Sequence, residues 1–223
     1  MLVAALCILV ACTGGSNKSH EPVDTLHAAA VATLASKSFH ADVTMTVPTS
    51  NPPTGTGTVD YQAPNMEVEH LGPGPKAAVT ISIGDTAYVT VPGQPGYFWT
   101  AKHPGSSGVG DTLGPIQWIA QAESVRFDGH SYTFELPASL VGALGAAKGV
   151  ATISDGRLET FNLHYVPTTK DMGDVSMSYT YSAYDELVDV QAPPGDHIVT
   201  QNPLTTCPCA FPAAASASKR RVM

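Results

Sequence analysis

The segment that decides the fold is Phe39-His40-Ala41-Asp42-Val43-Thr44-Met45-Thr46-Val47, in which apolar and polar side chains alternate without a break. Successive side chains of a strand point to opposite faces of a sheet, so the alternation predicts a β-strand with one apolar and one polar face. The preceding segment, 23–37, is rich in alanine and has apolar side chains at helical spacing, with Pro22 well placed at its start. We therefore expect the chain to change from helix to sheet near Ser38.

The same alternation recurs along the rest of the chain. We expect further strands at 56–61, 65–71, 77–83, 86–91, 97–100, 124–127, 132–136, 149–154, 157–166, 174–183 and 187–190, and helices at 113–124 and 137–147. The pairs Gly84-Asp85 and Asp155-Gly156 are typical of hairpin turns. These elements predict an α+β fold, in which a large curved antiparallel β-sheet (a half-barrel) forms a meander and two or three helices cover its concave face.

The N-terminal end has the features of a lipoprotein export signal. Residues 1–11 are apolar and too few to cross a bilayer, which takes about 20 residues, but they suit the apolar part of a signal peptide. They run into Leu9-Val10-Ala11-Cys12, which resembles a lipobox, and a polar Gly/Ser segment follows. We therefore predict a signal peptide at 1–11, and at 12–22 a Cys12 bearing a diacylglyceryl group with a flexible tether. This would anchor the chain to the cell membrane on its extracytoplasmic side.

A second interpretation of this end is an apolar N-terminal strand or helix with a buried free cysteine. An export signal normally begins with basic residues, whereas no charged residue precedes Lys18 here. We therefore expect the native start to lie upstream of Met1.

The composition favours one envelope domain and argues against binding of nucleic acid. Charged residues make up 13% of the chain and the net charge is −8, a balance that repels polyanions. The length suits one β-rich domain at 23–199, followed by a disordered tail at 200–223. In this tail, Cys207 and Cys209 are too close for a favourable disulfide and too few for a zinc site.

Residue patterns that carry catalysis do not stand out. There is no G-x-S-x-G segment, and no two of the eight histidines have the spacing of metal ligands. Glu67 and Glu69 lie two residues apart on one face of their strand, where they could form a carboxylate pair, although a solvated polar face is the favoured interpretation. We expect no enzymatic activity, no metal and no cofactor, with an envelope hydrolase as the alternative.

Several segments together resemble the LppX/LprAFG group of actinobacterial lipoproteins, which have a LolA/LolB-like fold. The order of lipobox, tether, alanine-rich helix and the strand from Ser38 is similar to that group. The likeness is clearest where Tyr179-Thr180-Tyr181-Ser182-Ala183-Tyr184-Asp185 and Val188-Asp189-Val190-Gln191-Ala192-Pro193-Pro194 resemble its closing strand and Pro-Pro stop. The resemblance covers most of 23–199.

This resemblance implies a half-barrel whose apolar concave face, closed by helices, shelters the acyl chains of a lipid, a glycolipid or a lipidated molecule. Burying an alkyl chain contributes about 0.8 kcal/mol per CH₂, so such a face would hold lipid well. The residues expected to line the cavity are Val43, Met45, Val47, Val59, Met66, Val68, Val79, Ile81 and Ile83 from strands, with Ile116, Ile119, Leu140 and Leu144 from helices.

The competing interpretation is that the same residues form a filled core. The protein would then be a non-catalytic interaction or envelope-assembly lipoprotein, which contacts an envelope protein through Tyr97-Phe98-Trp99 and the following loop.

Overall fold

The structure is a computed structural model that describes residues 21–48, 54–72, 78–102, 112–141, 145–166 and 173–199. The expected signal peptide, Cys12, nearly all of the tether and the tail lie outside these residues. The elements are α1 (Pro22–Leu34), β1 (Ser38–Thr46), β2 (Thr54–Gln62), β3 (Met66–Leu71), β4 (Ala78–Ile83), β5 (Thr86–Val91), β6 (Gln94–Lys102), α2 (Gly114–Ile119), β7 (Glu123–Phe127), β8 (Tyr132–Leu136), α3 (Ala138–Val141), β9 (Ala146–Ser154), β10 (Arg157–Val166), β11 (Val175–Ser182), the 3-10 helix η3 (Gly195–His197) and β12 (Ile198–Val199).

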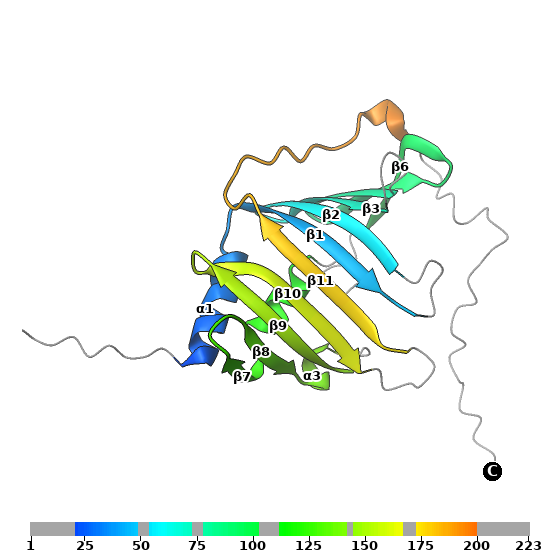
Figure 1. Ribbon diagram of the computed structural model, residues 1–223. Coiled ribbons are helices and arrows are strands. Elements are labelled where there is room, and N and C mark those ends of the chain that lie inside the picture. The colour runs from blue at the N-terminus through cyan, green and yellow to red at the C-terminus, as the bar shows by residue number, and fades with distance from the viewer. Residues whose placement is uncertain are drawn as a thin grey trace, which may run out of the picture.

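The described strands form one sheet in the order β12-β6-β5-β4-β3-β2-β1-β11-β10-β9-β8-β7 (Figure 1). β1–β6 make one meander and β7–β11 make another. The two meet in the antiparallel pair of β1 with β11, in which His40 lies opposite Ser182. The expected single meander is therefore wrong at this seam, because the last long strand returns to the first one instead of adding to an edge. β12 is parallel to its neighbour β6.

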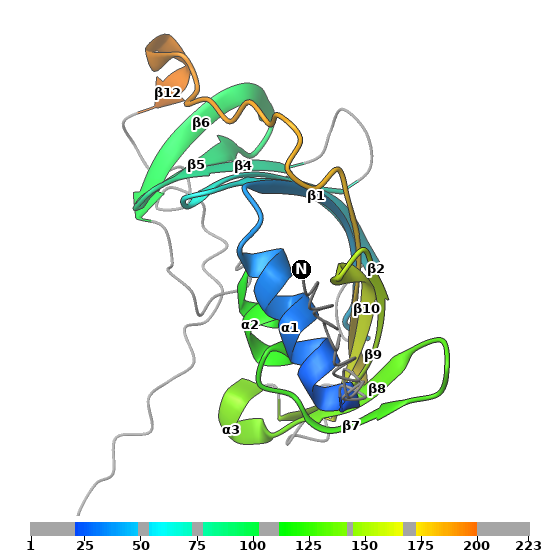
Figure 2. The ribbon, with the colours of Figure 1, turned by 90° about the vertical axis from the view of Figure 1, so that its left-hand side faces the viewer.

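The sheet is curved and wraps around the helices on its concave side (Figure 2). We call this side the inner face and the convex side the outer face. α1 packs on α2, β7 and β10, and its buried residues include Leu26, Ala29 and Ala30. Near its end the buried Thr33 hydroxyl donates to the Ala29 carbonyl (2.9 Å) and accepts from the Leu158 amide (3.0 Å). The α+β fold with helices on the concave face is confirmed.

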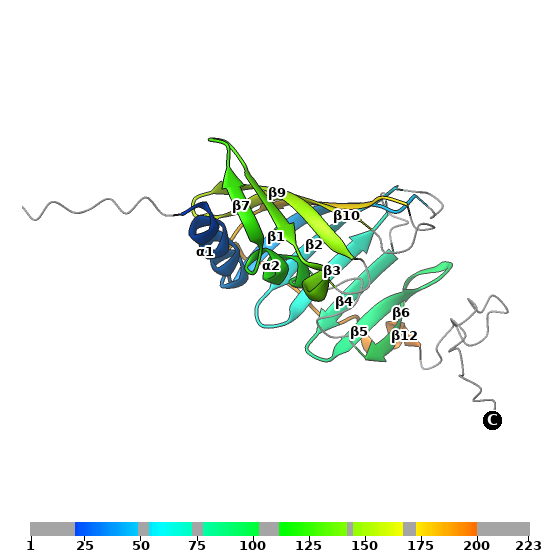
Figure 3. The same cartoon turned by 90° about the horizontal axis from the view of Figure 1, so that it is seen from below.

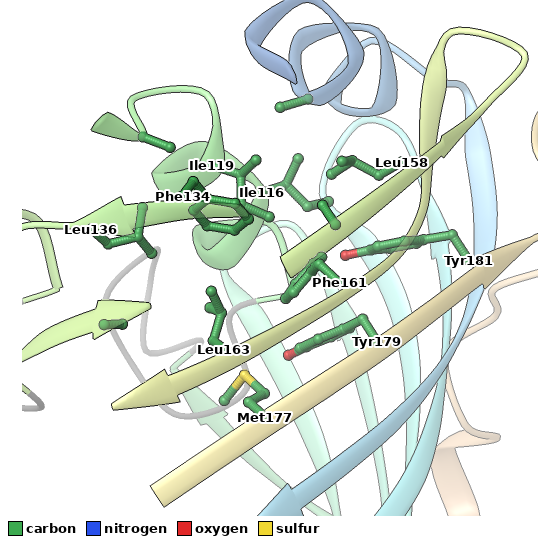
Figure 4. Packing of buried hydrophobic residues seen from close by; sticks show 14 of the residues in the cluster. Ile116, Ile119, Phe134, Leu136, Leu158, Phe161, Leu163, Met177, Tyr179 and Tyr181 are labelled. Carbon is green, nitrogen blue, oxygen red and sulfur yellow. The ribbon is translucent and has the colours of Figure 1, made fainter. Parts of the chain in front are cut away.

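The hydrophobic core lies between the helices and the part of the sheet formed by β1, β2 and β7–β11. Ile116 and Ile119 of α2 are completely buried and lie near Phe134 and Phe161 (Figure 4). Phe161 stacks on Tyr179 with ring centroids 4.7 Å apart. Burial of several aromatic rings in one cluster contributes both apolar area and directional ring contacts to stability.

The second and third helices are shorter than the sequence pattern predicts. α2 ends at Ile119, and α3 contains four residues. The segment expected to continue the third helix instead begins β9, because Ala147 and Gly149 alternate toward the core. Gly149 leaves room for the Phe134 ring, since a Cβ at Gly149 would lie 2.1 Å from a ring carbon.

Residues 183–194 form an extended segment, which we call the strap. It runs from the end of β11 along the outer side of the sheet to η3 and β12 (Figures 1 and 2). Val190 and Pro193 are buried. The expected strand at 187–190 is therefore wrong, because this part of the chain joins no strand ladder and buries Val190 but not Leu187. The short strand at Ile198–Val199 was not predicted.

Within the described ranges, no helix combines the length and the apolar character needed to cross a bilayer.

Candidate ligand-binding face

The pairing register fixes which side chains point to the inner face. Ala41 of β1 is buried in the core and lies opposite Val59 of β2. Val59 in turn lies opposite Glu69 of β3, and Glu69 lies opposite Thr80 of β4. Directly opposed residues of antiparallel strands project from the same face. Glu69, and with it Glu67 two residues earlier, therefore points to the inner face.

The inner face consists of two unlike halves. The half that includes β7–β11 belongs to the main hydrophobic cluster, whereas the buried apolar residues described in β3–β6, Ala87 and Val91 of β5, lie outside that cluster. The β3–β6 half presents Glu67 opposite Ser82 and Glu69 opposite Thr80. Further along this half, Val89 and Trp99 lie opposite each other on the inner face, and both are partly buried. The inner face is therefore apolar on one side and mixed on the other.

The two carboxylates of β3 are shielded from water. Glu67 is 9% exposed, and Glu69 is partly buried. Burial, followed by the neighbouring charge of Glu67, raises the pKa of Glu69 to about 7. The expectation that these residues belong to a solvated polar face is wrong. The glutamates point inward because the turn after β2 pairs Gln62 with Met66 and thereby fixes the register of β3.

A strip of apolar side chains and glycines borders the carboxylates on the inner face. Val43 and Met45 lie opposite Gly57 and Gly55, and Gly57 lies opposite Leu71. A Cβ at Gly55 would meet no atom within 4 Å, whereas a Cβ at Gly57 would lie 2.5 Å from the His70 carbonyl oxygen. Leu71 is 49% exposed. We call this strip the glycine-floored groove: it consists of Val43, Met45 and Leu71 around the two glycines, and its floor is open at Gly55.

Of the thirteen residues predicted to line a cavity, seven lie on the inner face or in the core that it shares with the helices. Val43, Met45 and Val59 point to the inner face. Ile116 and Ile119 are completely buried in the core, and Val47 and Leu140 pack against it. Leu144 lies outside the described residues. Ligand contact by these residues stays a prediction.

The other five predicted lining residues lie on the outer face, so they cannot share a cavity with Val43, Met45 and Val59 on the inner face. Val68 lies opposite Asp60 of β2 and Ile81 of β4, and the register carries the same outer position to Met66, Val79 and Ile83. Their prediction assumed that the apolar side of each strand must face inward. The strap runs along this side of the sheet (Figure 2), and Val190 within it is buried.

A tyrosine-rich region lies at the other end of the inner face. The Tyr181 hydroxyl is buried and has no hydrogen-bond partner among the described residues, and burial raises the pKa of Tyr181 far above its ordinary value. Beside it, a surface pocket of about 470 Å³ is lined by residues of the β9–β10 turn and by Tyr184. Arg157 closes this end, since its guanidinium lies over the Tyr184 ring and pairs with Asp185 at 2.6 Å.

Titratable side chains elsewhere do not assemble a catalytic or metal centre in the part of the chain that the structure describes. No group of three or more His, Cys, Asp or Glu residues there could hold a metal ion. The nearest approach is on the outer face, where His40 Nδ1 lies 2.7 Å from Asp60 Oδ1 and His40 Nε2 lies 3.7 Å from Asp42. The absence of enzymatic activity stays a prediction.

The aromatic segment of β6 is not a single surface. Trp99 shares the inner face with Val89, whereas Phe98 lies opposite Thr90 on one side and is paired with Ile198 of β12 on the other. The expected protein-contact surface at 97–99 is thus divided between two faces.

Sequence reasoning named Glu67 and Glu69 as a possible carboxylate pair but favoured a solvated face for them, and it missed the two groove glycines. The strand register across the short turn at 63–65 would have indicated that the glutamates point inward, because it places Tyr61 opposite Glu67. For the glycines, the signal was their position opposite Val43 and Met45.

Comparison with solved structures identifies the fold. The chain is similar to the lipoprotein LppX of Mycobacterium tuberculosis, with a TM-score of 0.51 and 20% identity over 76% of this chain and 98% of that one. It is also similar to LprF of Mycobacterium bovis, with a TM-score of 0.50 and 14% identity over 78% of this chain and 97% of that one. The fold is therefore LppX/LprF-like, as the sequence resemblance implied. The sequence matches no protein family and none of the curated proteins with which it was compared.

Proposed function

We propose that this protein is a lipid-anchored, non-catalytic component of the bacterial cell envelope that binds a lipid or a lipidated molecule on the inner face of its sheet. The observation that carries the proposal is the glycine-floored groove beside the inward carboxylates. An apolar groove next to shielded polar groups suits an amphiphile, which has an alkyl chain and a polar headgroup. The LppX/LprF-like fold supports the same class of ligand.

The groove is suited to an alkyl chain. Val43, Met45 and Leu71 border it, and the floor at Gly55 leaves open space where any other residue would place a side chain. Each CH₂ group that leaves water for such a surface contributes about 0.8 kcal/mol. The exposed Leu71 side chain would itself be covered by the bound chain.

The adjacent carboxylates are suited to a headgroup that donates hydrogen bonds. Glu69 is two residues from Leu71 on the same strand and points to the same face, so a ligand in the groove would place its polar end near Glu69. With a pKa of about 7, this group is partly protonated at neutral pH, so it can donate as well as accept a hydrogen bond. Polyol or sugar hydroxyls fit this chemistry better than a phosphate, which Glu67 and Glu69 would repel.

The proposed location follows from the N-terminal segment. A lipobox-like Leu9-Val10-Ala11-Cys12 ahead of a polar tether supports acylation of Cys12 and retention of the domain at the outer surface of the cell membrane. Globomycin-type inhibition of lipoprotein signal cleavage, followed by mass analysis of the N-terminal peptide, tests this part separately from ligand binding.

The test of ligand binding is native mass spectrometry of the full protein purified from membranes of an expressing bacterium in a mild detergent. We expect an additional mass of several hundred daltons, lost on denaturation. Gly55→Phe fills the groove and should abolish this mass, whereas Thr56→Phe places the same ring on the outer face of the same strand and should retain it.

Two results would count against the proposal. If the wild-type protein is bare and stays bare after incubation with envelope lipids, the inner face is a filled core and the interaction-module alternative takes its place. If the purified protein turns over ester, glycoside or peptide substrates, the non-catalytic assignment fails.

A further inference from the structure

We propose that the tip of the β7–β8 hairpin is a membrane-docking surface, which rests on the headgroup region of the bilayer that holds Cys12. The inference depends on the proposed lipid anchor and adds to it a defined orientation of the domain. It is carried by an aromatic pair whose Phe127 ring is exposed, by the rigidity of the turn that bears it and by the short distance to the anchored end of the chain.

The hairpin tip carries a stacked aromatic pair, of which one ring is exposed and the other partly buried. Phe127 is the last residue of β7 and is 48% exposed, although most large apolar side chains of the domain are buried. Its ring stacks on Tyr132, the first residue of β8, with centroids 4.6 Å apart. Aromatic rings with an apolar body and a polar tip concentrate at the level of lipid headgroups. A stacked Phe–Tyr pair at a surface tip is therefore suited to a bilayer interface.

The turn between these rings is held in one conformation. The Asp128 carboxylate accepts from the backbone amides of His130 (2.8 Å) and Ser131 (2.7 Å), and from the Ser131 hydroxyl (3.1 Å). A surface that is already ordered loses less conformational entropy on binding than a flexible one. The exposed Arg126 next to Phe127 adds a guanidinium that can bond lipid phosphates.

The tip lies on the same side of the domain as the start of α1. α1 packs on β7, and His27 Nε2 lies 2.9 Å from the Ala122 carbonyl just before that strand. Figures 2 and 3 both show the β7–β8 hairpin projecting beside the N-terminal end of α1. The aromatic pair is therefore near the point at which the tether enters the domain.

The length of the tether restricts how the domain can face the membrane. From Cys12 to Pro22 there are ten residue steps (22 − 12), which reach at most about 36 Å when fully extended and about 17 Å on average if flexible. Whatever the tether's conformation, the start of α1 stays within this distance of the bilayer. The hairpin tip therefore meets the membrane surface repeatedly, and a weak interfacial attraction is enough to hold it there.

The bilayer chemistry follows from the charge. The protein has a net charge of −8, and the exposed Asp24 lies in the first turn of α1, so attraction to anionic lipid would not drive docking. Insertion of aromatic rings between zwitterionic headgroups depends little on ionic strength. We expect docking on phosphatidylcholine that persists in high salt.

The experiment uses the full lipidated protein in phosphatidylcholine vesicles that contain brominated acyl chains, which quench tryptophan at short range. Phe127→Trp adds a third tryptophan to the two of the native chain, and about one third of the emission should be quenched if that ring lies at headgroup depth. Leu187→Trp is the matched control, because Leu187 is 98% exposed. It lies two residues after Asp185, whose amide donates to the Ser38 carbonyl beyond the C-terminal end of α1. This variant and the wild-type protein should show little quenching.

Flotation of the same vesicles separates the two proposals. If the protein floats but Phe127→Trp is quenched no more than Leu187→Trp, the docking surface is wrong and the anchor stands. If the wild-type protein does not float, the anchor fails and docking fails with it. Circular dichroism of both variants checks that each has folded, and Phe127→Tyr, which keeps an interfacial ring, provides a second comparison by vesicle-induced protection of the hairpin amides from hydrogen exchange.

Discussion

Replacing Glu69 with glutamine should stabilise the folded protein at pH 8 and have little effect at pH 4. Burial and the neighbouring Glu67 raise the pKa of Glu69 from 4.5 to about 7 in the folded state. A raised pKa means that the folded state holds its proton more tightly than the unfolded chain does. The wild-type protein therefore has its full stability from this group below pH 4.5 and loses it as the pH rises through about 7. Glutamine is neutral throughout and does not incur this loss.

The expected size of the effect comes from the displacement of the pKa. Each pKa unit corresponds to about 1.36 kcal/mol, so a change of about 2.5 units corresponds to about 3 kcal/mol of unfolding free energy at pH 8. Glu69 is partly accessible to water, which screens the charge and reduces this figure. We therefore expect Glu69→Gln to gain about 1–3 kcal/mol at pH 8.

The measurement is urea denaturation of wild-type protein and Glu69→Gln at pH 4, 6 and 8, with the free energy of unfolding plotted against pH. Glu186→Gln, which neutralises an exposed carboxylate at the start of the strap, is the matched control and should run parallel to the wild type. If the curves of wild type and Glu69→Gln are also parallel from pH 4 to 8, the side chain is solvated and the inward register of β3 is refuted.

Three further substitutions test the packing of the domain. Thr33→Val should cost about 1–3 kcal/mol in urea denaturation because it leaves the buried Leu158 amide without its acceptor; Thr33→Ser keeps that acceptor, and an equal loss in both variants would contradict the explanation. Gly149→Ala should cost about 1–3 kcal/mol because its methyl group would overlap the Phe134 ring, and Phe134→Leu in the same chain should recover part of the loss. Val190→Asp should release the strap and speed its cleavage by a protease, whereas unchanged cleavage would show that Val190 does not hold it.

The sequence pattern was sufficient to predict most strands but not the face that each strand turns inward. Alternation predicted β1, β4, β5 and β10 within a residue or two, because the period of two depends only on local backbone geometry. The faces of β3 and β4 were predicted wrongly, since alternation cannot say which side of a strand is covered. A distant segment, the strap, runs along the outer side of the sheet, and no local signal indicates where residue 190 will pack.

The candidate site was predicted in part for the same reason. Val43, Met45 and Val59 belong to a strand pair whose apolar side faces the helices. The assumption that the apolar side of a strand faces inward was therefore correct there. Glu67 and Glu69 depart from it, because they place ionisable groups on the inner face. Departures of this kind are expected where a site needs polar groups in a shielded position.

The pairing of β1 with β11 has a consequence for the order of folding. His40 and Ser182 are 142 residues apart in the chain (182 − 40), and closing so long a loop is slow compared with forming the hairpins on either side. Since a chain is made from its N-terminal end, the β1–β6 meander can form while β11 does not yet exist. During that interval β1 is an exposed edge with unpaired backbone groups, open to pairing with another chain. Asp42, on its outer face, places a charged side chain on this temporary edge and disfavours such pairing.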